Sequence, residues 1–323
     1  MTNTGPRGSS AASEASVPRG RSRWLRIMTF GAVGLASITA TSTPSAFAGT
    51  VRTSPTYVAL GDSFTSGPDV PAQLTSATTP RAPTTCLRSS RNYASLTSAA
   101  LGLSLNDRSC SSATTKDLST SQGPGIPAQL NALSPDTSLV SVGIGGNDLG
   151  FSTIAGNCVA GTPWGGTRVG WSCTKRYGPG GVDQLAGTLR RVGSAVATSL
   201  TDIRERAPHA RVFVVGYPDV VPPDGSGCWP RLPYSAHDLG FLRSAESDLN
   251  ATLAADATAA GDVFVDMAKP SAGHSGCASA ASRWVEPLLA SRGTFPLHPT
   301  TAGMAGMAKV LEAAISAGAP VSR

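Results

Sequence analysis

The 323-residue chain lacks several patterns that mark nucleic-acid, zinc and membrane proteins. After residue 48 it has no cluster of Lys and Arg with interleaved aromatic residues, so a nucleic-acid surface is not indicated. None of its six cysteines forms a C-x-x-C pair, which leaves a zinc site with little support. It also has no heptads, no internal repeat and no second apolar span beyond its amino-terminal region. A coiled coil, a solenoid and a multi-span membrane protein are therefore not expected.

The amino-terminal segment, residues 1–48, has the features of a secretory signal peptide. A polar, arginine-bearing start leads into an apolar run that is too short to span a bilayer comfortably. Small residues, Pro44 and an A-x-A pattern at 46–48 follow, which predicts cleavage between Ala48 and Gly49. We therefore predict a secreted protein with no stable membrane span after cleavage. The alternative, an uncleaved membrane anchor, is disfavoured by Pro44 and by the A-x-A pattern.

Most of the excess positive charge lies in this segment. It holds five arginines and one glutamate, so the formal net charge of +6 for the whole chain falls to +2 for residues 49–323. This remainder is long enough for one sizeable α/β domain and short for two. We predict a single domain over residues 49–323, and nothing in the sequence indicates more than a monomer.

The six cysteines all follow the predicted cleavage site, and their number is even. In a chain sent to an oxidising compartment, disulfides are the expected state. Six cysteines can pair in many ways, but these follow one another in three successive couples. The simplest assignment is Cys86–Cys110, Cys158–Cys173 and Cys228–Cys277. We expect the bridges to order the long loops that carry them.

Short apolar runs rich in β-branched residues alternate with helical patterns along the chain. The runs lie at 57–60, around 103–105, and at 139–142, 212–215 and 263–265. They predict buried strands of a parallel sheet with about five strands, because both faces of such a sheet are covered. Apolar residues at steps of three and four predict helices over about 182–203, 239–253 and 300–317. The alternation predicts an α/β fold, a doubly wound three-layer α/β/α sandwich.

Gly61-Asp62-Ser63 follows the first predicted strand. Ser63 therefore lies where strand gives way to helix, at the carboxyl end of the sheet, where α/β folds place their reacting groups. An isolated tripeptide of this kind is more often an ordinary turn, so its interpretation depends on residues elsewhere in the chain. Asp62 is adjacent to Ser63, and we expect its carboxylate to brace the turn.

A serine hydroxyl becomes a good nucleophile only when a base takes its proton, and the chain offers four histidines. His209 and His237 have the surroundings of surface residues, and His274 lies beside a cysteine that we expect to be bridged. His298 lies in FPLHPTTAG, a loop that enters the last predicted helix. His298 is therefore the best candidate for the base.

Acyl transfer also needs hydrogen-bond donors for the developing oxyanion. Two segments at predicted strand ends offer such donors. The first is Ser109–Thr115, after the second strand, and the second is the GGND stretch at Gly145–Asp148, after the third. In the latter, Asn147 carries a side-chain amide.

Taken together, GDSFTSG, GGND and HPTTAG resemble the ordered blocks of the SGNH (GDSL) hydrolase superfamily. The paired loop cysteines are similar to those of its secreted actinobacterial lipase and esterase branch. The resemblance spans most of residues 49–323. It implies Ser63 as nucleophile, His298 as general base and then acid, and the Asn147 amide and the Ser63 backbone N–H as oxyanion donors. It also implies a flavodoxin-like sheet, carboxylic-ester hydrolysis through an acyl-enzyme, and no metal or organic cofactor.

The chain departs from the family pattern at two positions. Where the family usually has a glycine whose backbone N–H binds the oxyanion, this chain has Ser112, which can serve if its φ is not forced positive. Where the family commonly has an acid three residues before the histidine, this chain has Phe295. Our hypothesis is that the Phe295 backbone carbonyl orients His298 in a Ser-His dyad. A carboxylate of Glu286 or Asp266 within about 3.2 Å of the second ring nitrogen would overturn it.

The leading interpretation is a secreted serine esterase or lipase that hydrolyses small-molecule or lipid esters. A carbohydrate acetylesterase with the same site is the nearest enzyme alternative, and a catalytically decayed exported binding module is the alternative from another class. Four loop aromatics either line an apolar groove or pack against the disulfides: Phe151, Trp164, Trp171 and Trp229.

Overall fold

The structure is a computed structural model, and it describes residues 54–75, 84–159, 173–177, 180–289 and 293–318. The predicted signal peptide, its cleavage site, Trp164 and Trp171 lie outside the described residues. The described residues belong to one compact unit. Within them, no helix has the length and apolar character needed to cross a membrane.

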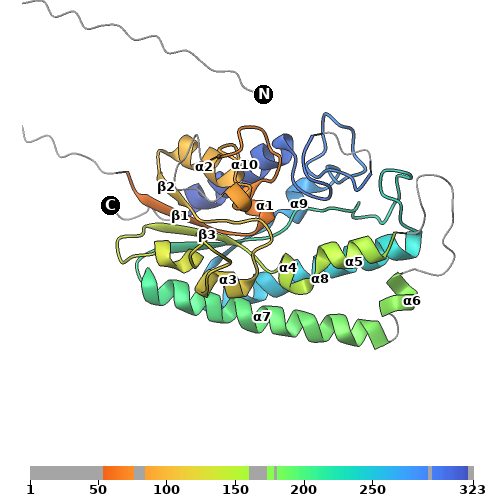
Figure 1. Cartoon of the computed structure of the whole chain (residues 1–323), viewed down its shortest axis with the longest axis horizontal. Coiled ribbons are helices and arrows are strands. Elements are labelled where there is room, and N and C mark those ends of the chain that lie inside the picture. The colour runs from red at the N-terminus through yellow and green to blue at the C-terminus, as the bar shows by residue number, and fades with distance from the viewer. Residues whose placement is uncertain (1–53, 76–83, 160–172, 178–179, 290–292, 319–323) are drawn as a thin grey trace, which may run out of the picture. The chain divides into compact units, whose positions relative to one another are not determined.

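A five-stranded parallel sheet forms the centre of this unit, in the strand order β2-β1-β3-β4-β5. The strands are β1 (Thr56–Gly61), β2 (Ser104–Asp107), β3 (Leu139–Gly143), β4 (Arg211–Val215) and β5 (Val263–Val265). Each lies on one of the apolar runs of the sequence, so the predicted strands and the α/β class are confirmed (Figure 1). Because all strands are parallel, their carboxyl ends meet at one edge of the sheet.

Three long helices match the three predicted helical patterns: α7 (Gly180–Arg206), α8 (Ala236–Ala260) and α10 (Thr301–Ala317). The shorter helices are α1 (Ser63–Ser66), α2 (Tyr93–Leu101), α3 (Thr115–Ser119), α4 (Gly146–Leu149), α5 (Phe151–Asn157), α6 (Cys173–Tyr177) and α9 (Ala268–Ser271). Single 3₁₀ turns lie at η1 (Thr84–Cys86) and η2 (Gln129–Ala132). Several of the short helices begin directly after a strand, so they aim their first residues at the carboxyl edge of the sheet.

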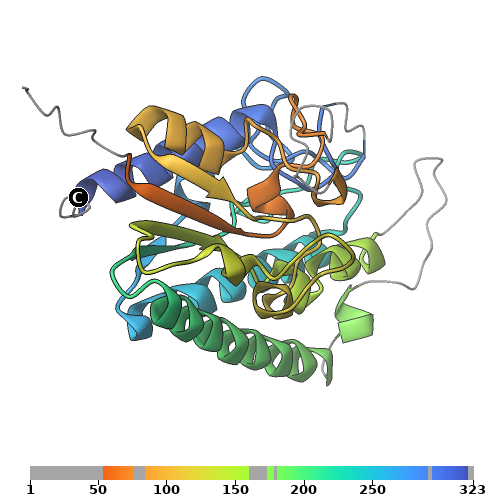
Figure 2. The same ribbon diagram turned by 60° about the vertical axis from the view of Figure 1, so that its left-hand side comes forward.

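Side chains that alternate along each strand divide the core into two apolar layers. On β1, Tyr57 and Ala59 belong to the layer under α2 and α10, whereas Val58 and Leu60 belong to the layer under α3, α7 and α8. Figures 1 and 2 show the sheet between these two groups of helices. The three-layer sandwich predicted from the sequence is therefore present.

The two outermost strands are less buried than the sequence interpretation expected. Central strands β1, β3 and β4 are almost fully buried, but β2 alternates between exposed and half-buried residues, and Val263 of β5 is 43% exposed. The strand order explains the difference, because β2 and β5 are the edges of the sheet. Hydrophobic runs alone do not distinguish an edge strand from a central one.

The three predicted disulfides are formed: Cys86–Cys110, Cys158–Cys173 and Cys228–Cys277. The first joins the η1 turn to the loop after β2, and the third joins the loop after β4 to the segment that precedes the His298 loop. Two of the bridges thus tether loops that follow strands β2 and β4 at the carboxyl edge.

The beginning of α10 is held against Trp284. The backbone N–H of Thr300 donates to the Trp284 carbonyl at 2.7 Å, and the Thr300 hydroxyl caps the helix by accepting from Gly303 N–H at 3.0 Å. A Cβ at Gly303 would overlap the same carbonyl oxygen. The glycine is therefore required by the close approach of helix and backbone just after His298.

We expect Gly303→Ala to lower the free energy of unfolding by about 2 kcal/mol, because the added methyl forces backbone atoms apart in a packed interface. Thermal and urea unfolding would measure this. Gly240→Ala is the matched control, since Gly240 also lies in a helix but has open space at the Cβ position. It should instead raise stability by up to about 1 kcal/mol. Equal effects at the two sites would contradict the packing argument.

Candidate active site

Ser63 lies in a tight turn between β1 and α1. A Cβ at Gly61 would overlap Thr65 and the Gly143 carbonyl, so the strand ends where only glycine fits. Asp62 is the N-cap of α1, and its Oδ1 accepts the backbone N–H of Phe64 at 2.8 Å. Ser63 is then the first residue of the helix and is 5% exposed. As expected from the sequence, the Asp62 carboxyl braces the turn that carries the serine.

The imidazole of His298 lies directly against Ser63. Its Nε2 is 2.8 Å from the Ser63 Oγ, and its Nδ1 is 2.8 Å from the Pro296 carbonyl oxygen. Because a carbonyl oxygen can only accept, Nδ1 carries the proton and Nε2 is left to accept from the hydroxyl. Burial lowers the pKa of His298 below its ordinary value, so the ring is neutral at pH 7. The pair thus has the protonation state that a base and its nucleophile need.

The carbonyl that orients His298 belongs to Pro296, and the prediction of Phe295 is wrong in this respect. The Phe295 carbonyl accepts the backbone N–H of His298 at 3.1 Å, so it closes a backbone turn. Leu297 has a φ of 60°, and this left-handed residue turns the chain so that the Pro296 carbonyl faces the ring. The Phe295 side chain is 47% exposed and contacts the imidazole edge-on, with ring centroids 5.0 Å apart.

Neither carboxylate considered as an alternative contacts the imidazole. Glu286 forms an ion pair with Arg283 at 2.7 Å, and its backbone N–H donates to the His298 carbonyl. The Asp266 carboxylate accepts the backbone N–H of Ala268 at 2.9 Å. Glu286 thus holds the backbone of the histidine loop, while a backbone carbonyl holds the ring.

Asn147 follows β3 in the first turn of α4 and lines the same cavity as Ser63 and His298. One N–H of its side-chain amide donates to the Ala113 carbonyl at 2.9 Å, so the amide is fixed in orientation. Its neighbour Asp148 accepts from the backbone N–H and the hydroxyl of Thr115. These bonds tie the loop after β3 to the loop after β2, where Ser112 lies.

Ser112 has a φ of 65°, so the condition set from the sequence, a φ that is not forced positive, is not met. The adjacent N–H groups of Ser111 and Ala113 donate to Cys86 and Cys110, whereas that of Ser112 has no acceptor among the described residues. Ser112 is not one of the residues that line the cavity. Its N–H is therefore unengaged within the described residues, its backbone conformation costs a non-glycine residue free energy, and its role as an oxyanion donor stays a prediction.

We expect Ser112→Gly to raise the free energy of unfolding by about 0.5–1 kcal/mol, because relief of the left-handed strain exceeds the extra backbone entropy of glycine. Thermal unfolding would measure the change. Ser111→Gly is the control, because Ser111 has no positive φ. The free energy of unfolding of this control should fall by about 0.5–1 kcal/mol. A loss of stability in Ser112→Gly would show that the turn is not strained.

Tyr217 joins the turn that carries Ser63 to the turn that carries Asn147. Its hydroxyl accepts the backbone N–H of Gly146 at 2.8 Å and donates to Asp62 Oδ2 at 2.6 Å. Its own backbone is clamped by the Asn250 side chain, which bonds both the N–H and the carbonyl of Tyr217. Burial raises the pKa of Asp62 to about 7, and the hydrogen bond from Tyr217 opposes this rise by stabilising the ionised carboxylate.

Tyr217→Phe should raise the pKa of Asp62 above about 7, because the variant loses the hydroxyl that donates to the carboxylate. Carboxyl-carbon NMR titration of protein labelled at aspartate would detect the change. Tyr57→Phe is matched in chemistry and burial, but the Tyr57 hydroxyl bonds Ser141 on β3. It should leave the Asp62 titration unchanged. An unaltered pKa in Tyr217→Phe would contradict this role.

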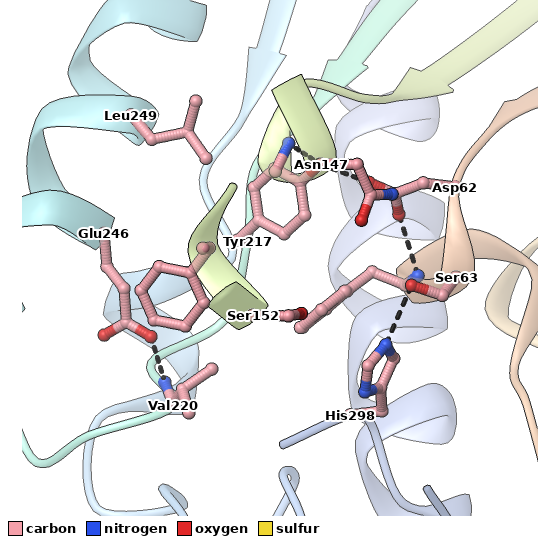
Figure 3. Close-up of a pocket in the computed structure, with 12 residues that line it drawn as sticks. Asp62, Ser63, Asn147, Ser152, Tyr217, Val220, Glu246, Leu249 and His298 are labelled. Carbon is pink, nitrogen blue, oxygen red and sulfur yellow. Dashed lines mark hydrogen bonds between the residues drawn. The ribbon is translucent and has the colours of Figure 1, made fainter. Parts of the chain in front are cut away.

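A small cavity opens beside Ser63 and His298. Most of its lining is apolar, and Figure 3 shows Ser63 and His298 on one side and Glu246, Val220 and Leu249 on the other. The remaining lining residues are Asp62, Phe64, Gly146, Asn147, Phe151, Ser152 and Tyr217. Phe151 therefore lines an apolar pocket as one interpretation had it, whereas Trp229 is not a lining residue and is 58% exposed.

The remaining histidines lie where the sequence placed them. His209 and His237 are exposed. His274 bonds the Ser282 carbonyl through Nδ1 and stacks on Trp284. Across the described residues, no group of three or more His, Cys, Asp or Glu residues is arranged to hold a metal ion.

Sequence reasoning missed Tyr217 and Glu246 as parts of the site. The position of each residue in the sequence could have indicated its place in the site. Tyr217 follows a buried strand by two residues, at the same sheet edge as Ser63 and Asn147. Glu246 occupies a position of the apolar stripe of α8, four residues after Leu242 and three before Leu249, where a leucine would be expected.

Comparison with known proteins gives concordant matches. A sequence model described as the GDSL-like Lipase/Acylhydrolase family matches residues 59–305. The chain is 34% identical over 302 residues to Lipase 2 of Streptomyces coelicolor, with 91% of this chain and 97% of that protein covered. It is 33% identical over 254 residues to Lipase 1 of the same organism, with 77% and 82% covered.

Solved structures give the same picture. The crystal structure of phospholipase A1 from Streptomyces albidoflavus NA297 superposes with a TM-score of 0.65 at 26% identity, covering 81% of this chain and 99% of that one. That of an extracellular lipase from Streptomyces rimosus gives 0.62 at 27% identity, with 81% and 100% covered.

Proposed function

The chain belongs to the GDSL-like lipase/acylhydrolase family and is a carboxylic ester hydrolase, and we propose that Ser63 is its nucleophile and His298 its general base. The observation that carries the proposal is the 2.8 Å contact between Ser63 Oγ and His298 Nε2, with the opposite ring nitrogen bound to the Pro296 carbonyl. In this dyad the imidazole beside Ser63 is neutral, and a backbone carbonyl orients it in place of a carboxylate. The hydrogen bond from Nδ1 to Pro296 also stabilises the imidazolium once the ring gains a second proton.

In the first half of the reaction, Ser63 Oγ attacks the carbonyl carbon of the ester while His298 Nε2 takes the hydroxyl proton. The tetrahedral intermediate carries its negative charge on the former carbonyl oxygen. The second N–H of the Asn147 amide and the backbone N–H of Ser63 are the donors for this oxyanion, and Ser112 N–H is the third. His298 then returns the proton to the leaving alkoxide, and the acyl-enzyme forms.

In the second half, His298 takes a proton from water, and the resulting hydroxide attacks the acyl carbon of the Ser63 ester. The intermediate collapses, Nε2 returns the proton to Ser63 Oγ, and the carboxylic acid leaves. Hydrogen bonds from Gly146 N–H to Tyr217 and from Tyr217 to Asp62 fix the turn that carries Ser63 relative to the turn that carries Asn147. This arrangement is kept through both halves of the reaction. No atom of Asp62 takes part in the proton transfers.

The apolar cavity beside the dyad favours acyl groups with hydrocarbon character, so we place small-molecule and lipid esters ahead of acetylated carbohydrate as substrates. Comparison of p-nitrophenyl esters of increasing chain length with acetylated xylan distinguishes the two classes. We also propose a signal peptide over residues 1–48, secretion, a single hydrolase domain over 49–323, and a monomer. The extracellular description of the Streptomyces rimosus lipase supports secretion.

A fluorophosphonate probe should label the folded protein covalently, and Ser63→Ala should abolish the labelling together with ester hydrolysis. Peptide mass spectrometry would locate the adduct. Ser66→Ala is the matched control, because Ser66 is a buried serine of the same short helix with no bond to His298. It should still be labelled. An unlabelled wild-type protein would favour the binding-module alternative and refute the assigned nucleophile.

A further inference from the structure

Glu246 is an acidic side chain at a position where helix packing calls for an apolar one. Leu242, Leu249 and Leu253, on the same stripe of α8, are all buried, and Glu246 itself is only 7% exposed. Burying a carboxyl group costs free energy unless it is neutral and hydrogen-bonded. The packing of α8 therefore does not explain why an acid stands here.

Burial favours the neutral form of the Glu246 carboxyl. Its Oε1 accepts the backbone N–H of Val220 at 3.0 Å. Burial raises the pKa of Glu246 well above its ordinary value, and the nearby Asp219 adds to the rise. The hydrogen bond from Val220 N–H and the charge of Arg243 oppose it. In its neutral form the carboxyl is a polar group with a donor and an acceptor at the wall of a mostly apolar cavity.

Glu246 lines the same cavity as the Ser63 and His298 dyad, on the opposite side of it (Figure 3). The cavity lining also includes Phe64, Phe151 and Leu249, which offer hydrocarbon surface. An acyl group attached to Ser63 would extend along this surface towards the carboxyl. The enclosed free space of the cavity is small, about 30 Å³.

We propose that Glu246 is a specificity-determining residue that limits acyl-chain length: the cavity accepts hydrocarbon chains that end before its carboxyl and disfavours longer ones. A longer chain would cover the polar atoms of the carboxyl without supplying hydrogen bonds in exchange, and the loss would appear in the transition state of acylation. This inference rests on the proposed acyl-enzyme at Ser63. It assigns to Glu246 no part in bond making or breaking.

The test compares Glu246→Met, an apolar side chain of similar length, with Glu246→Gln, which keeps a neutral polar end. The quantity measured is kcat/KM for p-nitrophenyl esters from acetate to laurate. In the methionine variant, the ratio of laurate to butyrate should rise about tenfold over the wild type. In the glutamine variant it should stay within about twofold, because the polar group is retained. A merely structural role would lower both rates together and leave the ratio unchanged.

An unchanged ratio in folded Glu246→Met would overturn the proposal. If that variant does not fold, Glu246→Leu replaces it, and the wild type gives a second measurement with alkyl fluorophosphonates of increasing chain length. Inactivation should be fastest at an intermediate length, and a steady rise through the dodecyl probe would also overturn the proposal. Labelling of Ser63 with an unaffected ratio refutes only the role of Glu246, whereas absence of labelling refutes the nucleophile.

Discussion

The site depends on one buried hydrogen-bond chain that runs from Gly146 through Tyr217 to Asp62. It connects the ends of two neighbouring strands, β1 and β3, through a residue that follows a third, β4. Each turn is also fixed locally, by the Asp62 cap of α1 and by the Asn147 bond to the loop after β2. The bridging hydroxyl sets the position of one turn relative to the other. The proposed nucleophile and the proposed oxyanion donor must hold a fixed separation, and this bridge fixes the relative position of the two turns that carry them.

The sequence was sufficient for the strands, the long helices, the disulfide pairs and the contact of Ser63 with His298, because each depends on a local pattern or on a known order of motifs. It was insufficient where a long-range contact or a single dihedral angle decides the outcome. Pro296 rather than Phe295 faces the imidazole because Leu297 is left-handed, and nothing in FPLHP specifies that angle. Tyr217 bonds partners 71 and 155 residues away. Exposure of Val263 follows from its place at the sheet edge, which periodicity does not reveal.

In a catalytic triad a carboxylate orients the histidine, but the carboxyl groups near this site make other contacts. Asp62 caps the serine helix, Glu286 pairs with Arg283 in the histidine loop, and Asp148 accepts from Thr115 to join two loops. All three act on backbone position or loop geometry. A backbone carbonyl orients the imidazole, so these carboxylates stabilise the turns and loops of the site. The buried carboxyl of Glu246 forms part of the cavity wall.

The 2.8 Å contact between Ser63 and His298 joins residues 235 positions apart in the sequence. Ser63 belongs to the first strand–helix turn, whereas its proposed base lies in the loop that enters the last helix, which is held by the hydrogen bond from Thr300 N–H to the Trp284 carbonyl. A serine without its base is an unreactive alcohol. The proposed dyad is therefore complete only when the loop before the last helix is docked against Trp284, so its assembly depends on contacts made by both ends of the domain.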